Sequence, residues 1–479
     1  MRTAETRIAS TTTQKWVLAL TAIASLMVAL DVTVVATALS TIRKDLGASV
    51  ESLEWTVNAY NLSFAVLLMT AAALGDRLGR RRMLVAGLAL FTVASAACAL
   101  APGIGVLIAA RVVQGVGGAL IMPHAMALLG AAFPADRRAW ALGIFGSVTG
   151  LAVVGGPLVG GAVTEGIAWP WIFWLNVPLG LVMIPLVRAR VAESVGAGRR
   201  LDVAGLLLVT AGAFGLVWGV VRGNAAGWGS AEVVSAIAAG ALFTIGFLRW
   251  ELRAREPMLP LRFFRTPAFS AGNAAGFFMH AALGGSVFFI AQFLQTVLGY
   301  GPLGAGLRLV PWTATLFIVS PIAGSWVRRI GERPLIVGGL LMQATGFGAI
   351  ALLAGRNLSF PDMIAPLIIA GCGVSMAMPA AQNAAMGAVP PGAIGKASGT
   401  YSTMRQLGSV FGVAIPVAVF AATGSFASAG AFTDGFGPAM AVTTGLSVLA
   451  ALAGLAAPGR RRIVLPTAEP VRVPVTEPT

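Results

Sequence analysis

The sequence is poor in charge, in cysteine and in histidine, and each shortage excludes a class of protein. Charged residues make up 11% of the 479 residues, whereas soluble chains carry about 25%, so this chain cannot cover several soluble domains. Two cysteines and two histidines lie in separate apolar runs, too scattered for a disulfide scaffold or a zinc cluster. The sequence also lacks the glycine loop of ATP-binding proteins. We therefore expect no metal, no cofactor and no enzyme activity.

Apolar residues dominate instead, at 57% of the chain with a mean hydropathy of +0.85. Fourteen apolar runs are long enough to span a bilayer, which takes about 20 residues. This pattern predicts an all-α polytopic membrane protein with fourteen transmembrane helices. The first run, 16–38, is longer than the apolar part of a signal peptide and contains Asp31, so we expect it to be retained as a span.

Lysine and arginine gather in alternate loops between the runs, and the opposite loops hold only Arg43, Lys44, Arg222 and Arg356. Because loops rich in lysine and arginine stay in the cytoplasm, both termini are predicted to be cytoplasmic. The net charge of +15 then reflects membrane topology, and we expect no nucleic-acid partner. The predicted location is the plasma (cell inner) membrane, where the chain is expected to work as a monomer.

Two sequence matches recur with the same offset of eight spans. The loop Asp76–Arg81 resembles Arg328–Arg333, and Gly146–Ala152 resembles Gly408–Ala414. The shared offset predicts two related six-helix bundles separated by two extra helices, and in such parallel repeats the substrate site lies between the halves. The expected segments are a cytoplasmic tail (1–15), the first bundle (16–187), a linker with two extra helices (188–249), an amphipathic cytoplasmic linker (250–268), the second bundle (269–457) and a disordered cytoplasmic tail (458–479).

Asp31 is the only acid that we place deep within a span. A charged side chain at mid-bilayer costs about 2.5–3.5 kcal/mol on insertion scales, so it needs a partner, a cavity or a proton. Burial favours the neutral carboxyl and a nearby cation favours the carboxylate, which makes Asp31 a candidate proton carrier. A structural ion pair or a helix-end cap is the alternative.

Arg111 lies early in the fourth run and shares a helical face with Gln114, Gly115 and Gly118. Arginine does not release its proton in proteins, so we expect Arg111 to bias the protonation of a nearby acid. The glycines let another helix approach closely, and pure packing is the alternative reading of this face.

Two further segments suggest conformational roles. The loop between the second and third runs carries candidates for a latch that forms in one transport state. A loop that only anchors the topology would have the same residues. The latch candidates are Asp76, Arg77, Arg80 and Arg81.

The fifth run combines glycines, which lower helical stability, with a proline that removes a backbone donor. It is a candidate hinge or close-packing seam: Gly150, Gly155, Gly156, Pro157, Gly160 and Gly161.

Polar and aromatic residues on one helical face of the ninth run would suit a cavity for amphipathic molecules, with helix–helix packing as the alternative. His280 on this face is a candidate second titrating group. The candidate cavity residues are Asn58, Asn61, Gln114, Asn273, Phe277, His280, Phe288, Gln382 and Asn383.

Five segments in chain order together resemble the major facilitator superfamily, and more narrowly its fourteen-helix drug:proton antiporter family of multidrug and antibiotic exporters. The resemblance covers roughly residues 15–457. The segments are Leu30–Leu39, Ala72–Arg82, Arg111–Gly118, Gly155–Gly161 and Trp171–Pro178. The departures are Ala72 where glycine is usual, Pro170 where arginine is usual, and Arg328 where the second-half loop usually has aspartate.

The resemblance implies the major facilitator fold and a proton-coupled exporter of a small amphipathic compound, such as an antibiotic, a dye or a secondary metabolite. It also implies that Asp31 and Arg111 couple protons to transport. The last six spans show no firm further acid, which favours a neutral or weakly basic substrate over a dication. An uptake symporter or uniporter on the same fold, and a membrane sensor that does not transport, are the alternatives.

Overall fold

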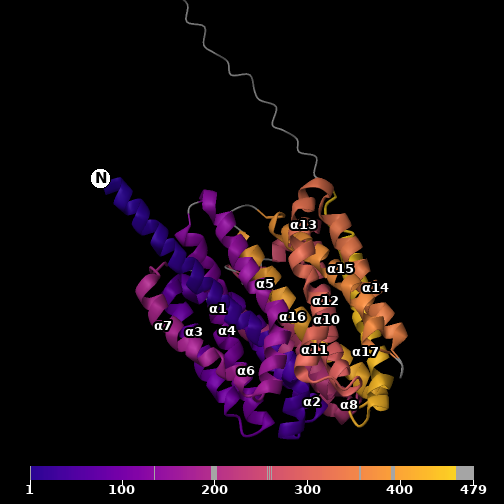
Figure 1. The fold of residues 1–479 in the computed structure, drawn as a ribbon. Coiled ribbons are helices and arrows are strands. Elements are labelled where there is room, and N and C mark those ends of the chain that lie inside the picture. Colours follow the sequence, from indigo (N-terminus) through magenta and orange to yellow (C-terminus); the bar gives the residue numbers. More distant parts are fainter. Residues whose placement is uncertain are drawn as a thin grey trace, which may run out of the picture.

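The computed structural model of the chain is a bundle of helices that run side by side along a common direction (Figure 1). It describes residues 2–133, 135–195, 202–255, 257, 259, 261–354, 358–389 and 394–459. Within these residues thirteen segments are long and apolar enough to cross a membrane, and α5 (Ala135–Gly166) adds a helix of 32 residues. The predicted all-α polytopic architecture with fourteen helices of spanning length is therefore confirmed.

The first half of the chain forms one group of helices in which α1 packs on α4 and α5, α2 packs on α4, and α3 packs on α4 and α7. The span expected at 170–187 is broken at Leu175, which separates a single turn from the helix that follows. The elements are α1 (Arg2–Leu46), α2 (Val50–Leu78), α3 (Arg80–Ala99), α4 (Ile104–Ala132), α5, α6 (Trp171–Trp174) and α7 (Asn176–Arg190).

Two extra helices follow, and α8 (Val203–Ala226) packs on α9 (Ala231–Arg253), on α2 and on the second half. The span expected at 303–326 is divided into three helical segments. The second half comprises η1 (Leu261–Arg265), α10 (Pro267–Thr296), α11 (Pro302–Arg308), α12 (Val310–Thr313), α13 (Thr315–Ile330), α14 (Glu332–Leu353), α15 (Phe360–Met386), α16 (Ile394–Thr423) and α17 (Ala429–Gly454). Most of the expected cytoplasmic tail, 460–479, and part of the expected linkers lie outside the described residues.

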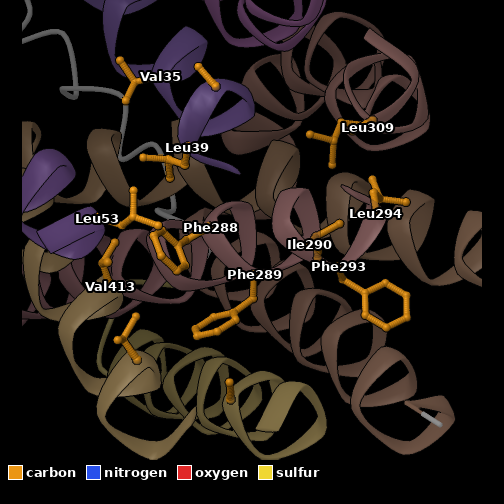
Figure 2. Close-up of a cluster of buried hydrophobic side chains, with 14 of the residues drawn as sticks. Val35, Leu39, Leu53, Phe288, Phe289, Ile290, Phe293, Leu294, Leu309 and Val413 are labelled. Carbon is orange, nitrogen blue, oxygen red and sulfur yellow. The ribbon is translucent and has the colours of Figure 1, made fainter. Parts of the chain in front are cut away.

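The two halves meet mainly where α2 packs on α16, α5 on α11, and α1 on α10. A cluster of buried side chains fills the junction, and it draws Leu39 from α1, Leu53 from α2, Phe288 from α10 and Val413 from α16 (Figure 2). The cluster lies toward the end of the bundle where α1 ends and α2 begins, which the charge pattern predicts to be the outer side. We call this end the outer end.

Backbones approach closely where glycines line the contact between α10 and α16. A Cβ atom on Gly412 would lie 1.9 Å from the carbonyl oxygen of Ala281, and one on Gly408 would lie 2.2 Å from that of Phe277. Lipid chains are as apolar as the helices, so such close van der Waals contact is a main source of helix association in a membrane.

Replacing Gly412 by alanine should therefore force α10 and α16 apart. Overpacking of this kind costs about 1–3 kcal/mol, so we expect Gly412→Ala to lower the Tm of the detergent-purified protein by several degrees. Gly445→Ala is the matched control, because a Cβ atom there meets nothing within 4 Å. Equal melting curves for the two variants, followed by intrinsic tryptophan fluorescence, would contradict this account of the packing.

Candidate functional site

A buried ion pair joins α1 to α4. Asp31 is 3% exposed and Arg111 is 1% exposed, and Nη1 of Arg111 donates to Oδ2 of Asp31. The structure thus brings together the two residues that the sequence predicts to act together. Because a buried ion is costly without a counter-ion, each charge depends on the other for its place inside the bundle.

Gln114 completes the polar contacts of the pair. Its Nε2 donates to Oδ1 of Asp31 and to Oγ of Ser95, both at 2.8 Å, and its Oε1 accepts from Nη1 of Arg111 at 2.7 Å. Asn176, from α7, donates to Oδ1 of Asp31 at 3.3 Å. Side chains from α1, α4 and α7 therefore meet at one carboxylate, and Gln114 links it further to Ser95 of α3. A change in the charge of Asp31 acts directly on three helices.

Aromatic rings and a backbone carbonyl hold the guanidinium of Arg111 on its other sides. The guanidinium carbon lies 4.2 Å from the centroid of the Tyr60 ring and 5.8 Å from that of Phe173, and Nε donates to the carbonyl of Thr56 at 3.2 Å. A desolvated cation–π contact is worth about 2 kcal/mol. Arg111 thus has contacts on α2 in addition to Asp31. Because arginine keeps its proton, the carboxylate is the partner whose charge can change.

The predicted hinge segment of α5 touches two different neighbours. A Cβ atom on Gly156 would lie 1.9 Å from Oγ1 of Thr33 on α1, whereas one on Gly161 would lie 2.5 Å from the carbonyl oxygen of Pro302 beside α11. Thr33 also donates to the carbonyl of Ala152 at 3.0 Å. The other members of the set sit on the same helix, with Gly160 against α1, Pro157 against Gly306 of α11, Gly155 in open space, and Gly150 earlier in α5.

The predicted latch residues make their described contacts within the first half. Nη2 of Arg80 pairs with Asp76 at 2.8 Å, while the backbone N–H of Arg81 donates to Oε1 of Glu193 at 2.8 Å. Arg77 is exposed. The loop turns at Gly79, whose φ of 106° is a conformation that favours glycine. A latch that forms in one transport state and breaks in the other remains a prediction.

The candidate cavity residues do not gather at one place. Phe288 is packed in the junction cluster, Asn383 donates to Glu332 at 2.8 Å, and a ring nitrogen of His280 lies 2.9 Å from the carbonyl of Gly276. Asn273 is buried and donates to the carbonyl of Phe269, Asn61 is buried on α2, Phe277 packs near Phe411, and Gln382 is half-buried on α15. Two cavities among the described residues, one beside α17 and one at the outer end, are lined by none of them.

One of those cavities is a recess between α1 and α10 at the outer end, with a volume of about 440 Å³. It is lined mainly by α1 and α10 and includes Arg43, which stacks 4.5 Å over the ring of Phe426. Ser40 donates to Gln295 across this junction, and Glu165 accepts from the backbone N–H of Leu303 at 2.9 Å. The described polar contacts between the halves are thus concentrated at the outer end.

Sequence reasoning missed four polar groups that the structure places at important positions. Ser95 and Asn176 join the ion pair, and Glu193 binds the backbone of the 79–82 loop from more than 100 residues away. Ser95 and Glu193 carry no local signal, whereas Asn176 lies in the segment Trp171–Pro178, whose polar residue was not singled out. Glu54 is different: it is 1% exposed on α2, so Asp31 is not the only buried acid in a span, and its spacing from Asn58 and Asn61 on one helical face could have revealed it.

Within the described residues no group of three histidine, cysteine, aspartate or glutamate side chains could hold a metal ion.

A family model described as Major Facilitator Superfamily matches residues 21–413. The chain is 35% identical to the tetracenomycin C resistance and export protein of Streptomyces glaucescens, covering 82% of this chain and 73% of that protein.

It is also 36% identical to the multidrug resistance protein Stp of Mycobacterium tuberculosis, covering 86% of this chain and 76% of that protein. Identity to the cephamycin export protein CmcT of Amycolatopsis lactamdurans is 36%, with 87% of both chains covered. Among solved structures, a POT family transporter in complex with a thioalcohol-conjugated peptide is similar with a TM-score of 0.68 at 15% identity, over 91% of this chain and 94% of that one. That likeness shows the fold.

The ion pair allows a direct test of stability. Arg111→Met leaves a buried carboxylate without a cation, which should cost about 3–5 kcal/mol, whereas Asp31→Asn combined with Arg111→Gln removes both charges. We expect the double variant to melt closer to the parent than Arg111→Met does. Arg222→Gln, which breaks ion pairs that are about 30% exposed, should shift the Tm little. A double variant less stable than Arg111→Met, in thermal unfolding followed by tryptophan fluorescence, would show that the two charges do not depend on one another.

Proposed function

Because the chain belongs to the major facilitator superfamily, we propose that it is an efflux transporter that moves a small amphipathic compound, such as an antibiotic, a dye or a secondary metabolite, out of the cell in exchange for protons. Relatives named for export or resistance match most of this chain. The observation that carries the proton coupling is the buried Asp31–Arg111 pair, held by side chains of α1, α4 and α7.

We place the protein in the plasma membrane with both termini in the cytoplasm, acting as a monomeric transporter without catalytic activity. The distribution of lysine and arginine between alternate loops supports this orientation. The described polar contacts between the halves lie at the outer end, so this conformation corresponds to a transporter closed toward the outside.

Protonation of Asp31 is the proposed coupling step. A proton on the carboxyl removes the negative charge that holds Arg111, and the amide of Gln114 then loses its charged acceptor. Two residues further along α1, Thr33 is hydrogen-bonded to α5. A shift of α1 would therefore move α5.

α5 in turn passes the shift to the second half. Pro157 of α5 contacts Gly306 of α11, where a Cβ atom would lie 2.2 Å from the Pro157 carbonyl oxygen. Packing this close leaves little free space, so α11 must follow when α5 moves. These contacts give a continuous physical route from the carboxyl of Asp31 to the junction where the substrate would pass.

One proton supplies enough energy for useful export. One elementary charge crossing a potential of 100 mV yields about 2.3 kcal/mol, and moving a neutral solute against a tenfold gradient costs about 1.4 kcal/mol. A single proton-binding acid is thus sufficient to drive the transport of a neutral compound.

Asp31→Asn should abolish proton-driven export, because an amide cannot bind and release the proton. The measurement is uptake of a fluorescent dye into inverted membrane vesicles energised by a pH gradient, with expression checked by immunoblot. Asp434→Asn, an exposed acid on α17, is the matched control and should transport at the parental rate. Full activity of Asp31→Asn would overturn the proton role, and failure of the parent to transport any dye of a broad panel would overturn the proposed function.

Closing the outer end permanently should also stop transport. Ser40→Cys and Gln295→Cys, in a background with Cys98 and Cys372 replaced by alanine, place two thiols where the native side chains are hydrogen-bonded across the halves. Cross-linking with a short bifunctional thiol reagent that a reductant can cleave should inhibit dye transport more than tenfold, and cleavage should restore it. Unchanged transport after complete cross-linking would contradict alternating access at this end.

A further inference from the structure

Glu54 is a buried carboxyl that the proposed coupling step does not use. It is 1% exposed on α2, and its Oε1 accepts a hydrogen bond from Nδ2 of Asn58 at 3.3 Å. Among the described residues no cation lies within 4.0 Å of its carboxylate, since the ion pairs of that part of the chain involve other acids. Glu54 therefore differs from Asp31, which is buried together with Arg111.

The position of Glu54 on α2 turns it toward the second half. Thr56 and Tyr60 mark the opposite face, where Arg111 of α4 binds. Ala65 lies eleven residues after Glu54, three helical turns away on the same face, and it packs in a cluster that is shared with α16. The members of that cluster on α16 are Leu407, Val410 and Ala414.

The neighbours of Glu54 along α2 also join other parts of the molecule. Leu53 packs in the junction cluster with Phe288 and Val413 (Figure 2). Trp55 packs near Phe214 of α8, with ring centroids 5.9 Å apart and the ring planes tilted by 40°. Glu54 lies only four residues from the outer start of α2 at Val50. Glu54 is therefore buried near the outer end, where the two halves are in contact.

Charged groups around this position are engaged elsewhere or lie at other levels. On the same helix Glu51 pairs with Arg222 of α8 at 3.3 Å, and on α16 no charged residue follows Arg405. The charged or titratable side chains on the helices packed against α2 are Arg2, Glu5, Arg7, Lys15, Asp31, Arg43, Lys44 and Asp45 of α1, Arg80–Arg82 and Cys98 of α3, Arg111 and His124 of α4, Arg222 of α8, and Lys396, Tyr401 and Arg405 of α16.

Burying an ionised carboxylate without a counter-ion is strongly unfavourable, and the group binds a proton instead. Glu54 must then be neutral while the outer end is closed. When the halves part at that end, water reaches the carboxyl, which ionises at neutral pH like any exposed glutamate. Opening and closing of the outer end are thereby linked to the binding of one proton.

We propose that Glu54 is a second proton-binding site, distinct from the Asp31–Arg111 pair, which takes up a proton from the outer solution when the outer end closes and returns it when that end opens. The inference rests on the proposed alternation between outward- and inward-open states. The proposal fixes the direction of the pH dependence. A low pH favours the closed outer end, because that state holds the additional proton, and a rise in pH favours the open outer end.

The test follows the outer end directly, without transport. Spin labels on Gly105→Cys of the first half and Ala427→Cys of the second, both exposed, report the separation of the halves in the full-length protein in lipid nanodiscs, in a background with Cys98 and Cys372 replaced by alanine. Asp31→Asn is included in this background so that the first proton site does not contribute. The ratio of open to closed populations should rise with pH between pH 5 and pH 8, by up to tenfold per pH unit.

Glu54→Gln should remove this response and keep the outer end closed at every pH, because the neutral amide imitates the protonated acid. Glu54→Asp should retain the response, and Glu51→Gln, three residues earlier on the same helix, should leave it unchanged. A response in Glu54→Gln equal to that of its parent would overturn the proposal. If Glu54→Gln does not fold, loss of the response in Glu54→Asp, or the same loss in Glu51→Gln, would overturn it equally.

The outcome is separable from the proposed function. Proton-driven export that persists in Asp31→Asn refutes the coupling role of Asp31 and leaves the pH response of the outer end untouched. A pH-independent outer end in the Asp31→Asn background, alongside export that requires Asp31, refutes only the role of Glu54.

Discussion

The ion pair between Asp31 and Arg111 is the constraint on which the first half of the molecule depends. Neither charge could be buried alone, because desolvation of an unpaired ion costs several kcal/mol. The pair is secured by Gln114 and Asn176 on one side and by the ring of Tyr60 on the other. The helices that carry these residues cannot separate without exposing or breaking the pair, so the interaction that stabilises the bundle is also the one that a proton would weaken.

Close packing between helices connects the ion pair in the first half to the second half of the molecule. Small residues let α5 lie directly on α1 at Gly156 and directly on α11 at Gly161. The same helix therefore contacts the element that carries Asp31 and an element of the second half. Close packing of backbones, rather than long side chains, makes this connection stiff, because a rigid contact transmits a displacement that flexible side chains would absorb.

Much of the fold could be predicted from the sequence, because apolar runs and alternate basic loops report directly on spans. The pairing of Asp31 with Arg111 could also be anticipated, since two ions inside spans must find each other. The interruptions at Leu175 and in the tenth span were not predicted, although Pro178 and Pro311 lie beside them and a proline removes a backbone hydrogen bond. Contacts such as that of Glu193 with the 79–82 loop were equally hidden, because they join residues far apart in the chain.

The placement of α8 has a consequence for how the halves can move. Its residues Ala213 and Val217 pack at once against Leu62 of α2 and Val410 of α16, so α8 lies across the line where the halves meet. Pulling the halves apart over their whole length would expose this cluster, whereas tilting one half against the other at the level of the cluster keeps its side chains in contact. Such a tilt widens one mouth only as it narrows the other. A water-filled pore open at both mouths, through which ions would dissipate the membrane potential, is therefore opposed by the packing of α8 on both halves.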